Sequence, residues 1–198
     1  IRAQLMTTVK DKNVFNIAIE GNFDDCQNIV KSMFADHQFS NSINMSAVNS
    51  INWARIVAQI VYYFFSYFRV SRLNEKINFS VPTGNFGDVY AGYLSKKMGL
   101  PIEKLIVATN QNDILHRAIS KGQYEAHSVV ETLSPSMDIQ VASNFERLIY
   151  DINNHNAEQT NKIMKDIMKE KKYLIKEEEL KKIKKDFISE TISEKELL

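Results

Sequence analysis

The chain has 198 residues, and its 25 lysine and arginine residues almost balance its 24 aspartate and glutamate residues. The resulting net charge of +1 gives no general reason to expect a nucleic acid or an anionic membrane as a partner. The single cysteine, Cys26, excludes a disulfide framework or a cysteine-built zinc site within the chain, and the 4 histidines show no metal-ligand spacing. We therefore expect a soluble globular protein without a metal site, in which Cys26 is a small buried hydrophobic residue.

The first elements predicted along the chain are a strand and a helix. Residues 14–19 form a short, mostly apolar run that ends at Gly21, as a buried strand would. Residues 24–34 place their apolar side chains on one helical stripe.

The most hydrophobic stretch of the sequence is residues 51–68, INWARIVAQIVYYFFSYF. A bilayer-spanning helix needs about 20 predominantly apolar residues, whereas this run contains Asn52, Arg55, Gln59 and Ser66. The pattern therefore favours a buried core helix over a membrane span.

An alternation of strands and helices follows. We predict a strand over residues 77–81, a helix over 86–98, a second strand over 105–108 and a second helix over 113–120. Because short loops join each strand to the next helix, this order is typical of an α/β fold, a parallel sheet with helical crossovers.

Residues 162–198 differ from the rest in composition, with 11 lysines and 9 acidic residues. Apolar residues recur at helical spacing between these charges. We expect a charged helical C-terminal segment of one or two amphipathic surface helices.

The loop between the first predicted strand and helix of this alternation, Gly84-Asn85-Phe86-Gly87-Asp88, has the composition of a phosphate site. Its two glycines would permit positive φ angles and a close approach of an anion to the backbone. The free amides and the dipole of the following helix would attract that anion. The loop matches neither GxxxxGK[ST] nor GxGxxG, and a tight turn that binds nothing is the alternative.

A second polar cluster, Asn49, Ser50, Asn52 and Arg55, precedes the apolar helix. Ser50 or Asn52 would cap that helix. The charge of Arg55 opposes the positive end of the helix dipole, so an anion clamp is one explanation for it. A buried ion pair with a carboxylate elsewhere is the other.

Four longer sequence segments carry a family resemblance: AVNSINWARI (47–56), VPTGNFGD (81–88), KKMGLPIEKLIVATNQNDIL (96–115) and TLSPSMDIQVASNFERL (132–148). They closely resemble the threonine synthase family, in the longer form found in fungi and many bacteria. Weaker similarity continues in residues 19–31 and in DFISETISEKEL near the end.

The resemblance implies a pyridoxal-phosphate enzyme of fold type II, the tryptophan-synthase-β-like fold, that converts O-phospho-L-homoserine and water to L-threonine and phosphate. It implies that Gly84, Asn85, Phe86, Gly87 and Asp88 hold the cofactor phosphate. The matched substrate-binding residues are Asn49, Ser50, Asn52 and Arg55. The implied domains are residues 1–45, the end of a smaller domain; 46–161, part of the cofactor-binding α/β domain; and 162–198, the charged helical segment. The implied location is cytoplasmic.

Two family features have no match. The family's Schiff-base lysine lies in a Phe-Lys-Asp-type segment, whereas Lys10, Lys12 and Lys31 lie in polar contexts, and the family's His-Thr-containing segment is also unmatched. We therefore expect an internal fragment, inactive alone, with no catalytic residue of its own and with exposed apolar surface.

The alternatives are a related phospholyase acting on O-phosphohomoserine, and a catalytically inactive phosphate-binding domain. The sequence does not indicate an oligomeric state.

Overall fold

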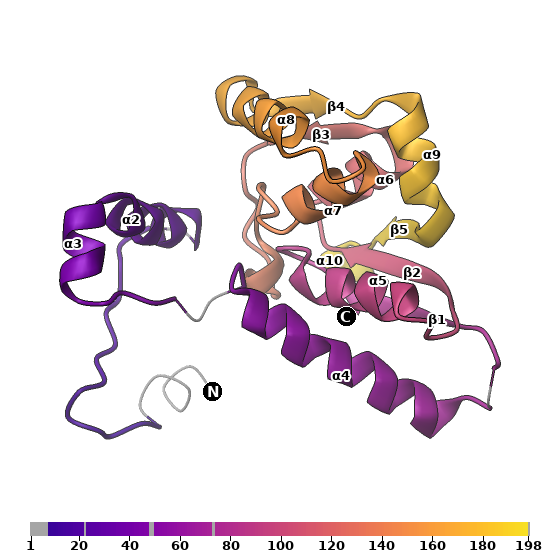
Figure 1. The fold of residues 1–198 in the computed structure, drawn as a ribbon, viewed down its shortest axis with the longest axis horizontal. Helices are drawn as coiled ribbons and strands as arrows, with labels where there is room; N and C mark the ends of the chain where they lie inside the picture. Colours follow the sequence, from indigo (N-terminus) through magenta and orange to yellow (C-terminus); the bar gives the residue numbers. More distant parts are fainter. Residues whose placement is uncertain (1–7, 22, 48–49, 73, 198) are drawn as a thin grey trace. The chain divides into compact units, whose positions relative to one another are not determined.

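The computed structural model describes residues 8–21, 23–47, 50–72 and 74–197, and it divides the chain into two compact units (Figure 1). The first unit is Ile1–Met45 and the second is Ser46–Leu198. The elements that the sequence analysis connects with phosphate binding belong to the second unit.

The first unit contains two helices, α2 (Phe23–Ala35) and α3 (His37–Ser42). The helix predicted over residues 24–34 is thus confirmed, and Cys26 on it is half-buried rather than buried. The strand predicted over residues 14–19 is wrong: these residues have no regular structure, and Phe15 is 79% exposed. A strand needs a neighbouring backbone to pair with, and no strand of the described chain pairs with this run.

The second unit is built on a three-stranded parallel sheet with the strand order β1-β2-β5. The predicted strand–helix alternation is confirmed, because α5 connects β1 to β2 and α6 follows β2. These elements are β1 (Ile77–Pro82), α5 (Gly87–Lys97), β2 (Ile102–Thr109), α6 (Ile114–Lys121) and β5 (Phe187–Thr191).

The C-terminal segment contains the expected helices but also completes the sheet. Its helices are the end of α8 (Ala157–Glu170), α9 (Glu177–Asp186) and the short α10 (Glu194–Leu197). The strand β5 pairs with β2, and Phe187 at its start is fully buried. The purely helical prediction missed β5, because the strand that pairs with it, β2, lies far away in the sequence.

The remaining elements lie outside the three-stranded sheet. A two-stranded antiparallel ladder joins β3 (Gln123–Glu125) to β4 (Lys172–Leu174). The single-turn helix η1 (Pro135–Met137) and helix α7 (Phe145–Ile152) lie between these two strands in the sequence.

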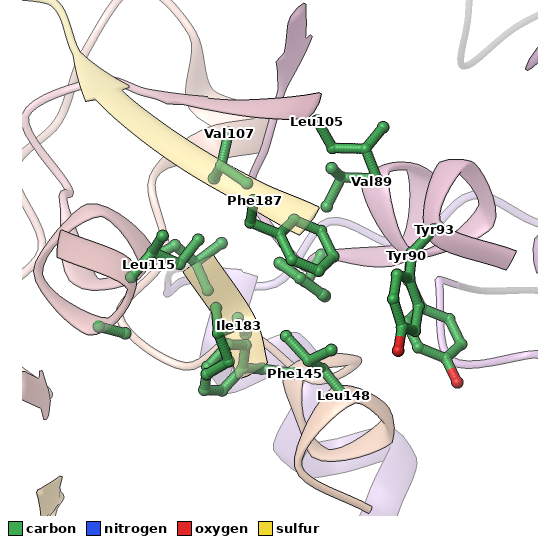
Figure 2. Packing of buried hydrophobic residues seen from close by; sticks show 14 of the residues in the cluster. Val89, Tyr90, Tyr93, Leu105, Val107, Leu115, Phe145, Leu148, Ile183 and Phe187 are labelled. Atoms are coloured by element: carbon green, nitrogen blue, oxygen red, sulfur yellow. The ribbon is translucent and has the colours of Figure 1, made fainter. Parts of the chain in front are cut away.

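One face of the sheet forms the core of this unit. Leu105 and Val107 of β2 and Phe187 of β5 are buried, and Figure 2 shows them beside Val89 of α5 and Leu115 of α6. The alternate residues of the same strands are half-buried or exposed, as with Ile188 at 41%. The core therefore lies on the side of the sheet that α5, α6 and α9 cover.

Helix α4 (Trp53–Val70) packs on α5, but it is not the fully buried core helix that its composition predicts. Only Ile56, Tyr63 and Tyr67 are buried. Side chains on other faces are open to solvent, including Phe65 at 62% and Phe68 at 64% exposure. The expected exposed apolar surface is present.

Among the described residues, no helix meets the length and hydropathy that crossing a membrane requires.

Candidate functional site

The glycine-rich loop lies at the carboxyl end of β1, where ligands of parallel α/β sheets bind. The amide of Thr83 still continues the sheet, donating to the carbonyl of Ala108 at 2.8 Å. The chain then leaves the sheet, and α5 begins at Gly87 with Phe86 as its N-cap. The loop thus delivers the chain from a strand end directly to a helix N-terminus.

The left-handed residue of this loop is Phe86, with φ +66°, and not either glycine. The expectation that Gly84 and Gly87 supply the positive φ angles is therefore wrong. A non-glycine residue rarely adopts this conformation, because its Cβ crowds the backbone. The ring of Phe86 is held between two others, with centroids 5.3 Å from Phe145 and 5.5 Å from Phe187, and this packing compensates the strain.

The glycines serve close packing instead. A Cβ on Gly84 would lie 2.8 Å from the carbonyl oxygen of Ser136, which is too close for any side chain. A Cβ on Gly87 would lie 3.2 Å from Nδ2 of Asn144 and 3.4 Å from Cδ1 of Ile56. Gly84 thus lets the segment around Ser136 approach the loop, and Gly87 lets the start of α4 approach it.

The main-chain amides of residues 84–89 donate to no atom of the described protein. The first internal bond of this region is from the amide of Tyr90 to the carbonyl of Phe86, at 3.1 Å. Phe86, Gly87 and Val89 are buried, and Gly84, Asn85 and Asp88 are half-buried. Main-chain amides without acceptors at the positive end of a helix dipole are suited to bind an anion.

The second predicted cluster lies next to this loop, since Ile56 and the carbonyl of Ser50 both stand within contact distance of the Gly87 position. Asn52 is the N-cap of α4, as predicted: its Oδ1 accepts from the amide of Ala54 at 2.9 Å, and its Nδ2 donates to the carbonyl of Ala47. Asn49, also assigned to this cluster, lies outside the described residues.

Two side chains of the cluster are left without partners in the described part of the protein. The hydroxyl of Ser50 is buried and makes no hydrogen bond there. Arg55 is exposed in the first turn of α4 and pairs with no carboxylate of the described residues. A hydroxyl and a guanidinium free to bind an anion thus lie on the segment that borders the glycine-rich loop.

Asn144 and Arg147, which the motif analysis did not single out, connect the two predicted segments. Nδ2 of Asn144 donates to the carbonyls of Ser50 at 2.9 Å and Asn85 at 3.1 Å. Arg147 donates to the carbonyl of Ile51 at 2.8 Å and to Oδ1 of Asn144 at 2.9 Å. Both residues belong to the segment TLSPSMDIQVASNFERL, with Asn144 as the N-cap of α7 and Arg147 in its first turn. Their three-residue spacing was the available signal.

Asp88 closes the loop on its helical side. Its carbonyl accepts the hydroxyl of Tyr63 from α4 at 2.9 Å. Burial raises the pKa of the Asp88 carboxyl above its ordinary value, and the neighbouring Tyr63 hydroxyl partly offsets this. Within the described residues, no group of three or more histidine, cysteine, aspartate or glutamate side chains could hold a metal ion.

No protein-family model matches the chain, but curated proteins and solved structures do. The threonine synthase of Pseudomonas aeruginosa is 55% identical over 157 residues, which are 79% of this chain and 34% of that protein. A crystal structure of a PLP-bound threonine synthase from Brucella melitensis superposes with a TM-score of 0.89 at 46% identity. This alignment covers 98% of this chain and 42% of the other.

This chain belongs to the threonine synthase family. The crystal structure of yeast threonine synthase agrees, with a TM-score of 0.85 at 45% identity over 98% of this chain and 40% of that chain. The α/β fold of the threonine synthases that the resemblance implied is therefore confirmed for the part of the family fold that this chain represents. The chain spans about a third of the length of the curated relatives it matches first.

Proposed function

We propose that the complete protein is a threonine synthase, a PLP-dependent carbon–oxygen lyase that converts O-phospho-L-homoserine and water to L-threonine and phosphate. In this proposal, residues 46–198 supply two adjacent anion-binding elements. The observation that carries it is the run of amides at residues 84–89 without acceptors in the described protein, beside the helix start that bears Arg55. Family membership supplies the identity of the two anions.

The residues present fit the phosphate group of the cofactor. A phosphate requires several hydrogen-bond donors that have no other acceptor, together with positive potential. The amides of Gly84, Asn85, Phe86, Gly87 and Asp88 provide both. When bound, pyridoxal phosphate supplies the electron sink for the chemistry, and the task of this loop is to anchor and orient it.

The segment before α4 would hold the phosphate of the substrate. Arg55 would bind it through the guanidinium, and the unpartnered hydroxyl of Ser50 would donate a hydrogen bond. Asn52 has one amide N–H left after capping α4, and it fixes the helix start from which Arg55 projects. Asn49 completes this set by its match to the family motif.

The proposal places the Schiff-base lysine outside these 198 residues. Lys10, Lys12 and Lys31 are all exposed to solvent and do not lie in an enclosed pocket that could surround a cofactor ring. Residues 1–45 would then be the end of the family's smaller domain. Alone, the chain would bind phosphate groups without catalysing the reaction.

The experiment is a kinetic comparison of Arg55→Ala with the parent in the complete protein. We expect kcat/KM for O-phospho-L-homoserine to fall on the order of 100-fold, mainly through KM, because a bidentate contact to the substrate phosphate is lost. The matched control is Arg69→Ala, at the opposite end of the same helix, where the guanidinium stacks on Phe65.

Four outcomes distinguish the proposed function from its alternatives. Threonine and phosphate as products, with the loss confined to Arg55→Ala, support the proposal. A keto acid in place of threonine identifies the related phospholyase. An unchanged kcat/KM in Arg55→Ala refutes the clamp, and no turnover by the complete parent protein leaves the inactive phosphate-binding domain.

A further inference from the structure

Asn144 and Arg147 lie at the junction of the two anion-binding elements without belonging to either motif. We propose that they are positioning residues that hold the start of α4, and with it Arg55, at a fixed place relative to the glycine-rich loop. This inference rests on the proposed function, because it assigns the two residues to the spacing between the cofactor phosphate and the substrate phosphate.

Asn144 connects the two anion-binding elements by hydrogen bonds. It is fully buried, and its Nδ2 donates to a carbonyl of each element, Ser50 and Asn85. Its main-chain amide donates to the same Asn85 carbonyl at 3.0 Å, and its Oδ1 accepts from Arg147. Two main-chain carbonyls would lose a buried donor without this side chain, so the junction depends on an amide at this position.

Arg147 extends this hydrogen-bond network to α4. Its Nη2 donates to the carbonyl of Ile51, just before the N-cap, and its guanidinium lies over the ring of Trp53, 5.4 Å from the ring centroid. It therefore contacts the chain on both sides of the N-cap residue Asn52. A shift of Arg147 is transmitted to the first turn of α4, the turn that carries Arg55.

The electrostatics of Arg147 agree with a place beside an anion. Its hydrogen-bond acceptors are the neutral oxygens of Ile51 and Asn144, and it forms no ion pair with a described carboxylate. Arg117 on α6 is a useful contrast, because it pairs with Asp113 at 2.9 Å. The charge of Arg147 thus remains available to raise the potential around the two elements.

The test uses the complete protein saturated with pyridoxal phosphate and inorganic phosphate as the probe. With the cofactor in place, the glycine-rich loop is filled, so added phosphate reports on the substrate-phosphate position. We expect Arg147→Lys, which keeps the charge but loses the forked contact, to weaken phosphate binding about tenfold. The matched control is Arg117→Lys, which should leave phosphate binding unchanged. The parent side chain of Arg117 bonds Asp113 and the carbonyl of Glu125.

A double-mutant cycle with Arg55→Ala isolates positioning from a structural effect. If Arg147 acts through Arg55, the double variant binds phosphate no more weakly than Arg55→Ala alone. Losses that multiply, or parent-like binding in Arg147→Lys, overturn the inference. Should Arg147→Lys not fold, Trp53→Leu removes the ring beneath the guanidinium and takes its place in the cycle. A parent protein that binds no phosphate and forms no threonine refutes the proposed function instead.

Discussion

Phe86 is the residue whose backbone shapes the candidate site. Its left-handed conformation turns the chain at the start of α5. The residue is 1% exposed, and its ring packs against those of Phe145 and Phe187. The sequence shows a glycine-rich loop and suggests that the glycines adopt positive φ. They could not be assigned their true role from sequence, because that role depends on Ser136 and Asn144, which come from distant parts of the chain.

Asp151 offers a test of stability at the same scale, away from the site. Burial alone would raise the pKa of its carboxyl, but hydrogen bonds from Lys97, Tyr93 and His155 outweigh burial and lower it. A lowered pKa in the folded state means that the stabilisation is complete above the ordinary pKa and is lost as the pH falls through the lowered value. It ties α7 to α5.

We therefore expect Asp151→Asn to lower the free energy of unfolding by about 2 kcal/mol near neutral pH. The difference from the parent should shrink as the pH is lowered below the ordinary carboxyl pKa. Urea unfolding across a pH series measures both quantities. A difference that stays constant into strongly acidic conditions would contradict this account of the carboxylate.

At the scale of elements, the contact between α4 and α5 depends on Gly92. A Cβ at this position would lie 2.5 Å from a ring carbon of Tyr63 and 2.8 Å from Cδ2 of Leu105. Tyr63 cannot easily move aside, because it is buried and its hydroxyl bonds the carbonyl of Asp88. The close approach of α4 to α5 is also what brings the start of α4 to the glycine-rich loop.

Gly92→Ala has two effects of opposite sign on the stability of the fold. Alanine is favoured over glycine in a helix by about 1 kcal/mol, whereas overpacking a core costs about 1–3 kcal/mol. We expect the clash to outweigh the propensity, so that the variant is less stable in urea unfolding. Adding Tyr63→Leu should recover part of the loss. A stabilised Gly92→Ala would show that the two helices are not in close contact.

The elements also show why sequence reasoning succeeded in some places and failed in others. Strands and helices joined by short loops with clear glycine ends, such as α6 before Gly122, were predicted because local chemistry determines them. The burial of α4 and the strand β5 were not, because both depend on which other elements cover them. Asn144 and Arg147 were missed for the same reason, since their partners lie far away in the sequence.

At the scale of the whole molecule, the described chain shows part of a family fold. Its sheet has three strands with one well-buried face, and α4 exposes large apolar side chains such as Phe65 and Phe68. The superposed threonine synthases are more than twice as long as this chain, which covers 42% and 40% of them. This portion includes the two neighbouring elements that we propose bind the two anions.

The central claim is that the amides of residues 84–89 hold a phosphate group, and the most direct measurement compares two forms of the cofactor. Pyridoxal phosphate and pyridoxal, which lacks the phosphate, are titrated into the complete protein and into its Gly84→Ala variant. The parent should strongly prefer the phosphorylated form. Gly84→Ala should lose at least about tenfold of that preference, because the new Cβ displaces the loop from Ser136. Equal affinity of the parent for both forms, or a preference that Gly84→Ala leaves intact, would contradict the account.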